Sequence, residues 1–198
     1  MNSPGSPEEI RAALRRFRRR RIPRWSSRRA AMAVIVFSGA DGPGVLLTRR
    51  VGSLGTEHGQ LALPGVRVDR WESAAAAARD RLGPGLGLSL PADSVLGRLD
   101  TYVTDSKAVI TPVVLWAGPA AAQRDPRSGE LSVPLTDLDV EPVFLASAGS
   151  PRPMIRLPVH GEWLHAPAAA ILHQFREVVL HRRVTRVAHL GQPVSATR

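Results

Sequence analysis

The segment from Leu46 to Leu88 constrains the fold most, because signals for a strand, a turn and a helix follow one another within it. An apolar strand pattern leads to Pro64-Gly65, then to a loop that carries Asp69 and Glu72. The alanine-rich run that follows predicts a short helix over Ala74–Leu82. Several folds use this order of elements to present carboxylates to a metal ion and a phosphate.

The composition indicates one ordinary domain with an aliphatic core. Of the 198 residues, 43% are hydrophobic but only 5% are aromatic, so Ala, Val, Leu and Ile must fill the interior. The absence of cysteine excludes disulfides and thiolate metal sites. No apolar run approaches the roughly 18 residues of a membrane span, and the first residues are too rich in arginine for a secretory signal. We therefore expect a cytoplasmic protein with no membrane span.

Positive charge is concentrated at the start of the chain. Residues 1–29 contain ten arginines against Glu8 and Glu9, which gives +8 of the formal net charge of +10. We divide the chain into this basic N-terminal arm, a domain (30–182) and a basic C-terminal tail that is expected to fray (183–198). The arm could bind nucleic acid or an acidic protein, and the sequence does not indicate an oligomeric state.

A helix is predicted within the arm. Ser6-Pro7 is a helix start, and Ile10, Leu14 and Phe17 recur at helical spacing on one face. The pattern predicts a helix over 7–22 that ends ahead of a proline. Such a basic amphipathic helix could lie on nucleic acid or anionic lipid. The interpretation we favour is that its apolar stripe docks on the domain while the arginines face solvent.

Short apolar runs bounded by Gly, Pro and Asp predict strands along the domain. Ala30–Phe37 is continuously apolar and rich in β-branched residues, which indicates a buried strand, and Val45–Thr48 is predicted to form a hairpin with it. Ala166–Arg182 is predicted to be a helix, and Trp163 is expected to pack on the core. Further strands are predicted at Leu61–Leu63, Val95–Asp100, Val109–Ala117 and Leu131–Leu135, with a hairpin within 141–165.

The block LLTRRVGSLGTEHGQLALPGV resembles the signature LLTxR[SA]xxxRxxxGxxxFPGG, which precedes the catalytic box in the coenzyme A pyrophosphatase branch of the Nudix hydrolases. Downstream segments are similar to the same branch, so that the resemblance covers roughly residues 29–180. It implies a single α/β domain: a Nudix-type α/β/α sandwich with a mixed sheet between helices. The matching residues are Leu46, Leu47, Thr48, Arg50, Gly59, Pro64 and Gly65, and the departures are Val51, Gly55, Leu63 and Val66.

The Nudix box has the pattern G-x5-E-x7-R-E-U-x-E-E-x-G-U, where U is apolar. Its last glutamates project from one helix face, where they hold Mg²⁺ or Mn²⁺ against a pyrophosphate. A gapless overlay from Val66 keeps Glu72 and the later glycine, Gly87. Asp80-Arg81 replaces Arg-Glu, Pro84-Gly85 replaces the paired glutamates, and a register shifted by one residue does not restore them. Gly83-Pro84-Gly85 is expected to end the helix at about Leu82, so that the ligand-bearing turn is lost with its ligands.

Several residues remain candidates for a site, each with a structural alternative. If Mg²⁺ or Mn²⁺ binds, the metal ligands would be Glu72, Asp80 and Asp69, and Glu72 and Asp80 are also the catalytic candidates. The resemblance implies substrate contacts from Arg50, His58, Gly59 and Gly65. Structurally, Glu72 or Ser73 could cap the helix, Asp80 and Arg81 could form a solvated face, His58 could simply be exposed, and Arg50 could pair with an acid. Trp71 is expected to fill the empty metal site or to pack on the hairpin.

Three functions are compatible with these residues. The first is a Nudix-fold protein that has lost most metal-binding glutamates, hydrolyses weakly or not at all, and binds a nucleotide-like ligand or a protein partner. The second is an active metal-dependent pyrophosphohydrolase on coenzyme A or another nucleoside diphosphate derivative. The third is an adaptor that acts through the arginine-rich N-terminal helix. The loss of three glutamates favours the first.

Overall fold

Strand β1 (Arg29–Gly39) lies at the centre of the fold and carries the continuous apolar run of the sequence. Its side chains alternate between two hydrophobic clusters: Met32 and Val34 belong to one, and Ala33 and Ile35 to the other. Because both faces are covered, the strand has no polar face, as the sequence predicted. The structure is a computed structural model, which describes residues 5–22, 28–50, 59–119, 129–147 and 150–192.

The main sheet is mixed. β1 pairs in parallel with β7 and antiparallel with β2 and β4, and the strand order is β3-β2-β1-β7-β5, with β8 beside β2 and β6 beside β7. The predicted hairpin and the predicted strands are present; β4 and β6 are additions, since three and two residues are too few for a sequence pattern. The remaining strands of this sheet are β2 (Gly42–Arg50), β3 (Gln60–Ala62), β4 (Gly65–Arg67), β5 (Val95–Arg98), β6 (Tyr102–Val103), β7 (Val109–Trp116) and β8 (Glu130–Pro134).

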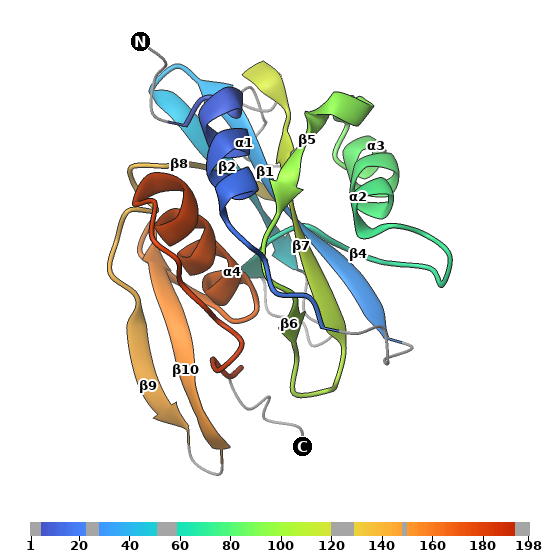
Figure 1. Cartoon of the computed structure of the whole chain (residues 1–198). Coiled ribbons are helices and arrows are strands. Elements are labelled where there is room, and N and C mark those ends of the chain that lie inside the picture. Colours follow the sequence, from blue (N-terminus) through green and yellow to red (C-terminus); the bar gives the residue numbers. More distant parts are fainter. Residues whose placement is uncertain (1–4, 23–27, 51–58, 120–128, 148–149, 193–198) are drawn as a thin grey trace.

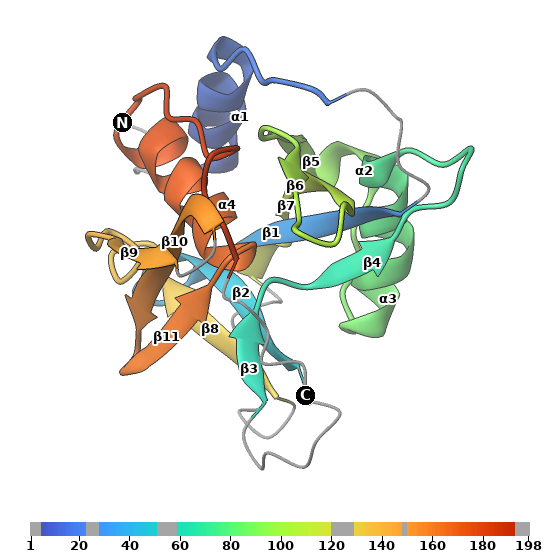
Figure 2. The ribbon, with the colours of Figure 1, turned by 90° about the horizontal axis from the view of Figure 1, so that it is seen from below.

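Helices cover both faces of the sheet, which gives the α/β sandwich expected from the sequence (Figures 1 and 2). α1 (Pro7–Arg16) and α4 (Ala168–Phe175) pack on one face, where Ile10 and Ile171 are fully buried. The opposite face is covered by α2 (Ala74–Ala77), whose alanines pack closely against β1. Among the described residues, no helix is both long enough and apolar enough to cross a membrane.

α1 docks on the domain by its apolar stripe, as favoured from the sequence. Ser6 caps it by accepting a hydrogen bond from the backbone N–H of Glu9 at 3.3 Å. The helix ends at Arg16, however, and the prediction that it continues to about Ile22 is wrong. The reason is tertiary: the backbone N–H of Arg20 donates to the buried carboxylate of Asp100, which holds the chain after α1 in an extended path.

The helix after the Asp69–Glu72 loop continues beyond its predicted end. Ser73 caps it, accepting from the N–H of Ala76 at 3.0 Å, and α2 is followed by a π-helical segment, η1 (Ala78–Leu82), and by α3 (Gly83–Gly85). The expectation of a stop at Leu82 is wrong, because Pro84 falls in the first turn of α3, where its missing N–H costs little. The turn that would carry the box ligands is therefore formed, although its side chains cannot bind a metal.

The end of this helix explains one retained residue of the box. Gly87 has φ +61° and its N–H donates to the carbonyl of Pro84 at 2.9 Å, while the N–H of Leu88 donates to the carbonyl of Gly83 at 2.7 Å. These two bonds form a Schellman motif, which needs a left-handed residue at this position. The positive φ of this turn therefore explains why the position holds a glycine, as in the Nudix pattern.

A second, three-stranded sheet packs beside α4. It contains the hairpin expected within 141–165, formed by two antiparallel strands, and adds a third strand. α4 continues as η5 (Arg176–Leu180), close to the predicted helix end. Trp163 does not pack on the core as expected: it is partly exposed, with the guanidinium of Arg156 3.9 Å from its ring centroid. The strands are β9 (Val143–Ser147), β10 (Ser150–Val159) and β11 (Glu162–His165), in the order β11-β10-β9.

The C-terminal segment packs on the domain as far as it is described. Val187 and Leu190 are buried, and Arg186 forms an ion pair with Asp100 at 2.8 Å. The expectation of a frayed tail is therefore wrong for residues 183–192. Two apolar residues among many arginines were too weak a signal to predict this contact.

Candidate functional site

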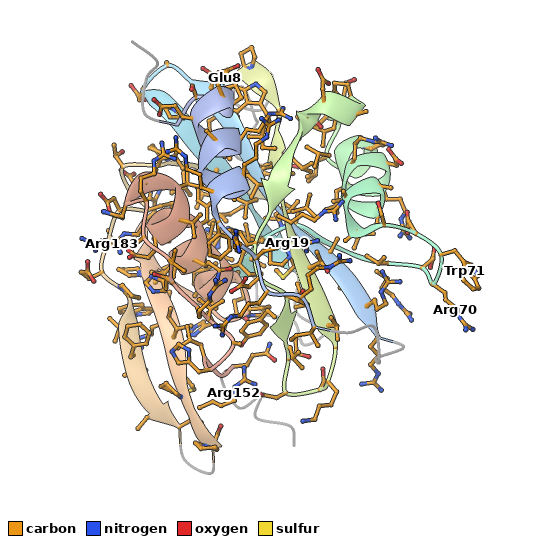
Figure 3. All side chains as sticks on the ribbon, viewed as in Figure 1. Glu8, Arg19, Arg70, Trp71, Arg152 and Arg183 are labelled. Atoms are coloured by element: carbon orange, nitrogen blue, oxygen red, sulfur yellow. The ribbon has the colours of Figure 1, made fainter. Side chains whose placement is uncertain are left out.

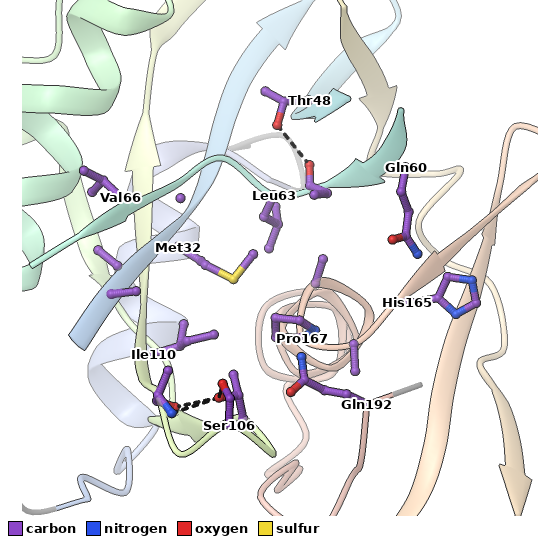
Figure 4. A pocket seen from close by; sticks show the side chains of 18 of the residues that line it. Met32, Thr48, Gln60, Leu63, Val66, Ser106, Ile110, His165, Pro167 and Gln192 are labelled. Carbon is purple, nitrogen blue, oxygen red and sulfur yellow. Dashed lines mark hydrogen bonds between the residues drawn. The ribbon is translucent and has the colours of Figure 1, made fainter. Parts of the chain in front are cut away.

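A cleft of about 790 Å³ opens where β1, β3, β4, the β6–β7 loop and the start of α4 meet (Figure 4). Its apolar wall includes Met32, Leu63 and Ile110, and Pro167 lies beside α4. Pockets of this size are typical of sites for small molecules. The fold therefore provides a site beside Gly65, which the sequence had placed in contact with substrate.

The polar groups of the cleft are mostly neutral. Gln60, His165 and Gln192 line it, as do the hydroxyls of Thr48 and Thr104. Burial, with a smaller contribution from the positive charge of Arg156, lowers the pKa of His165 below its usual 6.5, so its imidazole is uncharged at neutral pH. These side chains can exchange hydrogen bonds with a base, a sugar or an amide.

Arg67 contributes the formal positive charge of the cleft. It is exposed, it ends β4, and no aspartate or glutamate is among the described residues that line the cleft. A guanidinium in a site without carboxylates favours an anionic ligand such as a phosphate. The cleft can bind a phosphate-bearing molecule through this side chain, but its described residues offer no carboxylate for a divalent cation.

The carboxylates of the degenerate box lie beside the cleft, in the loop that follows β4, and they are bound by arginine. The guanidinium of Arg81 donates to Glu72 and lies 3.6 Å from the carboxylate of Asp69. Glu72 also accepts from the backbone N–H of Asp69 at 3.3 Å, and Arg81 donates to the backbone carbonyl of Arg67. Arg81 is therefore not simply part of a solvated face: it neutralises two of the three predicted metal ligands.

The third predicted ligand has a different partner. Asp80 is exposed, and both its oxygens accept from Arg79, at 2.5 and 2.9 Å, which lowers the pKa of the carboxyl. Among the described residues, no group of three His, Asp or Glu side chains could hold a metal ion together. Because their oxygens are paired with guanidinium groups, Asp69, Glu72 and Asp80 do not fit Mg²⁺ or Mn²⁺ in this arrangement.

The predicted substrate contacts are only partly described. Arg50 ends β2 opposite Gln60 of β3, but its side chain lies outside the described part of the chain, as does His58. Gly59 is buried, and its carbonyl accepts from Arg49 at 3.3 Å. Gly65 begins β4, pairs with Met32, and lines the cleft.

Trp71 does neither of the two things expected of it. It is 89% exposed, so it fills no metal site and packs on no hairpin. Two residues that the sequence did not single out, Arg67 and His165, line the cleft, and Arg81, which the sequence suggested as part of a solvated face, binds the box acids instead. Arg81 drew attention in the sequence because it stands at a glutamate position of the box. Arg67 and His165 could not be predicted, because they come from β4 of the main sheet and β11 of the second sheet, which only the tertiary fold brings to one cleft.

Comparison with family models and with curated proteins gives no match. Among solved structures, the chain is similar to a mutT/nudix family protein from Listeria innocua, with 20% identity and a TM-score of 0.44 over 57% of this chain and 82% of that one. A Nudix hydrolase from M. smegmatis has 21% identity and a TM-score of 0.43, over 81% of this chain and 91% of that one. An Ap4A hydrolase from C. elegans has 18% identity and a TM-score of 0.40, over 55% of this chain and 81% of that one. At these identities and TM-scores, the resemblance to the Nudix family continues to depend on the sequence motifs.

Proposed function

We propose that this chain is a Nudix-type protein that binds a nucleotide-like, phosphate-bearing small molecule in the cleft without hydrolysing it. The observation that carries the proposal is the position of Arg81. Its guanidinium engages Glu72 and Asp69, the two acids of the box loop that a catalytic cation would need. Without a divalent cation, the charge on a pyrophosphate and the attacking water would lack their usual stabilisation.

The cleft supports binding even though the box does not support catalysis. Arg67 would receive a phosphate, and Gln60, Gln192 and neutral His165 would orient the rest of the ligand by hydrogen bonds. The LLTxR-type block suggests coenzyme A or another nucleoside diphosphate derivative as the ligand class. Met32, Leu63 and their neighbours would cover its apolar parts.

Binding is tested by titration calorimetry with coenzyme A, ADP and ADP-ribose, in EDTA and then in Mg²⁺. We expect at least one ligand to bind equally well in both conditions. Arg67→Gln should weaken that binding about tenfold, which corresponds to about 1.4 kcal/mol for a lost charged hydrogen bond. Arg183→Gln, which removes the same charge from an exposed arginine that does not line the cleft, should leave that binding unchanged. No binding by any of the three would contradict the proposal.

Hydrolysis is tested with the same compounds in Mg²⁺ and in Mn²⁺, by chromatography of the products. We expect no turnover above that of a Glu72→Gln variant. Turnover that needs metal and disappears in this variant would show an active pyrophosphohydrolase with a rebuilt site, and would overturn the proposal. Binding with no turnover would support it.

A further inference from the structure

A small hollow of about 70 Å³, which shares no lining residue with the cleft, is lined by arginines from three separate segments. Arg19 and Arg21 follow α1, Arg29 begins β1, and Arg98 ends β5. Ser73, Thr101 and Thr111 contribute hydroxyl groups, three apolar residues also line the hollow, and no carboxylate is among its described residues. Guanidinium and hydroxyl donors around one hollow are complementary to a phosphate group.

The charge of this hollow is poorly compensated within the described part of the protein. Arg19, Arg21 and Arg98 form no ion pair there, and Asp100, the acid that attracts Arg19, already accepts from Arg186 at 2.8 and 2.9 Å. Burial, together with repulsion from Arg98 and Arg21, lowers the pKa of Arg19. A positive potential of this kind attracts anions from solution.

The loop that carries Trp71 is attached to the same hollow. Arg29 donates to the backbone carbonyls of Asp69 and Arg70 at 3.0 and 3.2 Å, and to that of Glu72 at 3.3 Å. Trp71 therefore directly follows Arg70, whose carbonyl accepts from Arg29, and comes two residues before Ser73, which lines the hollow. Figure 3 shows the ring at the outer end of this loop, where the guanidinium of Arg70 lies 5.0 Å from its centroid.

We propose that the arginine-lined hollow and the Arg70–Trp71 loop form one binding surface for single-stranded nucleic acid. The arginines bind phosphates, and the exposed indole stacks on a base whose face is free because the strand is unpaired. Proteins that bind single strands without sequence preference combine these same two features, a basic groove and an aromatic side chain.

A membrane surface fits these residues less well. Insertion into lipid needs several apolar side chains on one face, whereas the neighbours of Trp71 in the loop are Asp69, Arg70 and Glu72. The other large exposed apolar side chains of the described chain lie outside this loop, at Phe144, Trp163 and Val184. The arginines also line a hollow rather than a flat face, which suits a discrete phosphate of a flexible strand.

The test uses the full chain and fluorescein-labelled single strands, oligo(dT) and oligo(U) of twelve nucleotides, with binding followed by fluorescence anisotropy at several salt concentrations. Trp71→Ala should weaken binding at least about fivefold, the lower range for loss of one stacked base, and Trp71→Phe should restore most of it. Arg21→Gln and Arg98→Gln should each weaken binding and reduce the slope of log K against log salt by about 0.7.

Three controls make the outcome decisive. Arg183→Gln removes the same charge from an exposed arginine on the side of α4, and should change binding less than Arg21→Gln does. Circular dichroism establishes that each variant is folded. Absence of single-strand binding, equal losses in Arg183→Gln and Arg21→Gln, or preferential binding to phosphatidylserine vesicles would overturn the proposal. The cleft is not part of this surface, so Arg67→Gln should leave oligonucleotide binding unchanged. The test of this surface is therefore independent of whether the cleft binds a nucleotide-like ligand.

Discussion

The guanidinium of Arg81 donates a hydrogen bond to the carboxylate of Glu72, nine residues earlier in the chain. In the gapless overlay on the Nudix box, Glu72 matches the first glutamate and Arg81 replaces a later one. An arginine in place of this glutamate does more than remove a metal ligand, because its guanidinium forms an ion pair with Glu72, the acid that is retained. A divalent ion would have to displace this guanidinium and also compete with its contact to Asp69.

Replacing Arg81 should therefore create affinity for a metal. In Arg81→Glu, three carboxylates (Asp69, Glu72 and the new one) would meet without a competing cation, and we expect Mn²⁺ to bind at least about tenfold more tightly than in the parent protein. Electron paramagnetic resonance of free Mn²⁺ measures this directly. Arg79→Glu makes the same charge change beside Asp80 and serves as the control. Equal Mn²⁺ affinity in the two variants would show that the gain is general electrostatics.

Gly85 and Gly87 provide a matched pair for the end of this helix. A Cβ at either position would meet no atom within 4 Å, so sterics against neighbours do not distinguish them. Gly85 is helical, and Gly85→Ala should raise the free energy of unfolding by about 0.5–1 kcal/mol. Gly87 has φ +61°, and Gly87→Ala should lower it by about 1–2 kcal/mol. Urea denaturation of both variants checks the pair, and equal effects would contradict the Schellman assignment.

Much of the fold could be predicted from the sequence because its signals are local and strong. The apolar run at β1 requires cover on both faces, and the alanines of α2 allow the helix to pack closely on it. The end of α1 could not be predicted, because it depends on the contact between Arg20 and Asp100, eighty residues apart. The helix through Pro84 was missed for a related reason: a π-helical segment before it changes which turn the proline occupies.

Less of the candidate site could be predicted. Sequence positions identified Glu72 as retained and Pro84-Gly85 as incapable of binding metal, and both statements depend only on residue type. Whether Arg81 turns toward Glu72 or toward solvent depends on side-chain packing, which the pattern does not contain. The cleft was also not predictable, because its polar residues, such as Gln60 and Gln192, come from distant parts of the chain.

Asp100 should be a main stabilising residue of the N- and C-terminal segments. Its buried carboxylate accepts from Gln174 at 2.9 Å and from Arg186, and also from the backbone N–H of Arg20. In Asp100→Asn an NH₂ group would face one of these donors, so we expect the free energy of unfolding to fall by about 2–4 kcal/mol. Chemical denaturation measures the change. Asp105→Asn breaks an exposed ion pair with Arg152 and should cost less than about 1 kcal/mol; a similar cost in both variants would contradict the assigned role.

His165 should make stability depend on pH in a specific direction. Its pKa is lowered from 6.5, chiefly by burial, so the unfolded chain binds a proton more readily than the folded one. Well above pH 6.5, His165 is uncharged in both the folded and the unfolded state. As the pH falls through 6.5 toward the lowered pKa, the unfolded state gains a proton first, and the folded state loses stability. His165→Gln removes this titration, so the parent protein should lose more stability than the variant between pH 7.5 and pH 5.5. Urea denaturation at both values measures the two losses, with His173, whose pKa is also lowered by burial, present in both proteins. If the difference in unfolding free energy between parent and variant is the same at both pH values, the pKa of His165 is not lowered by folding and the prediction is wrong.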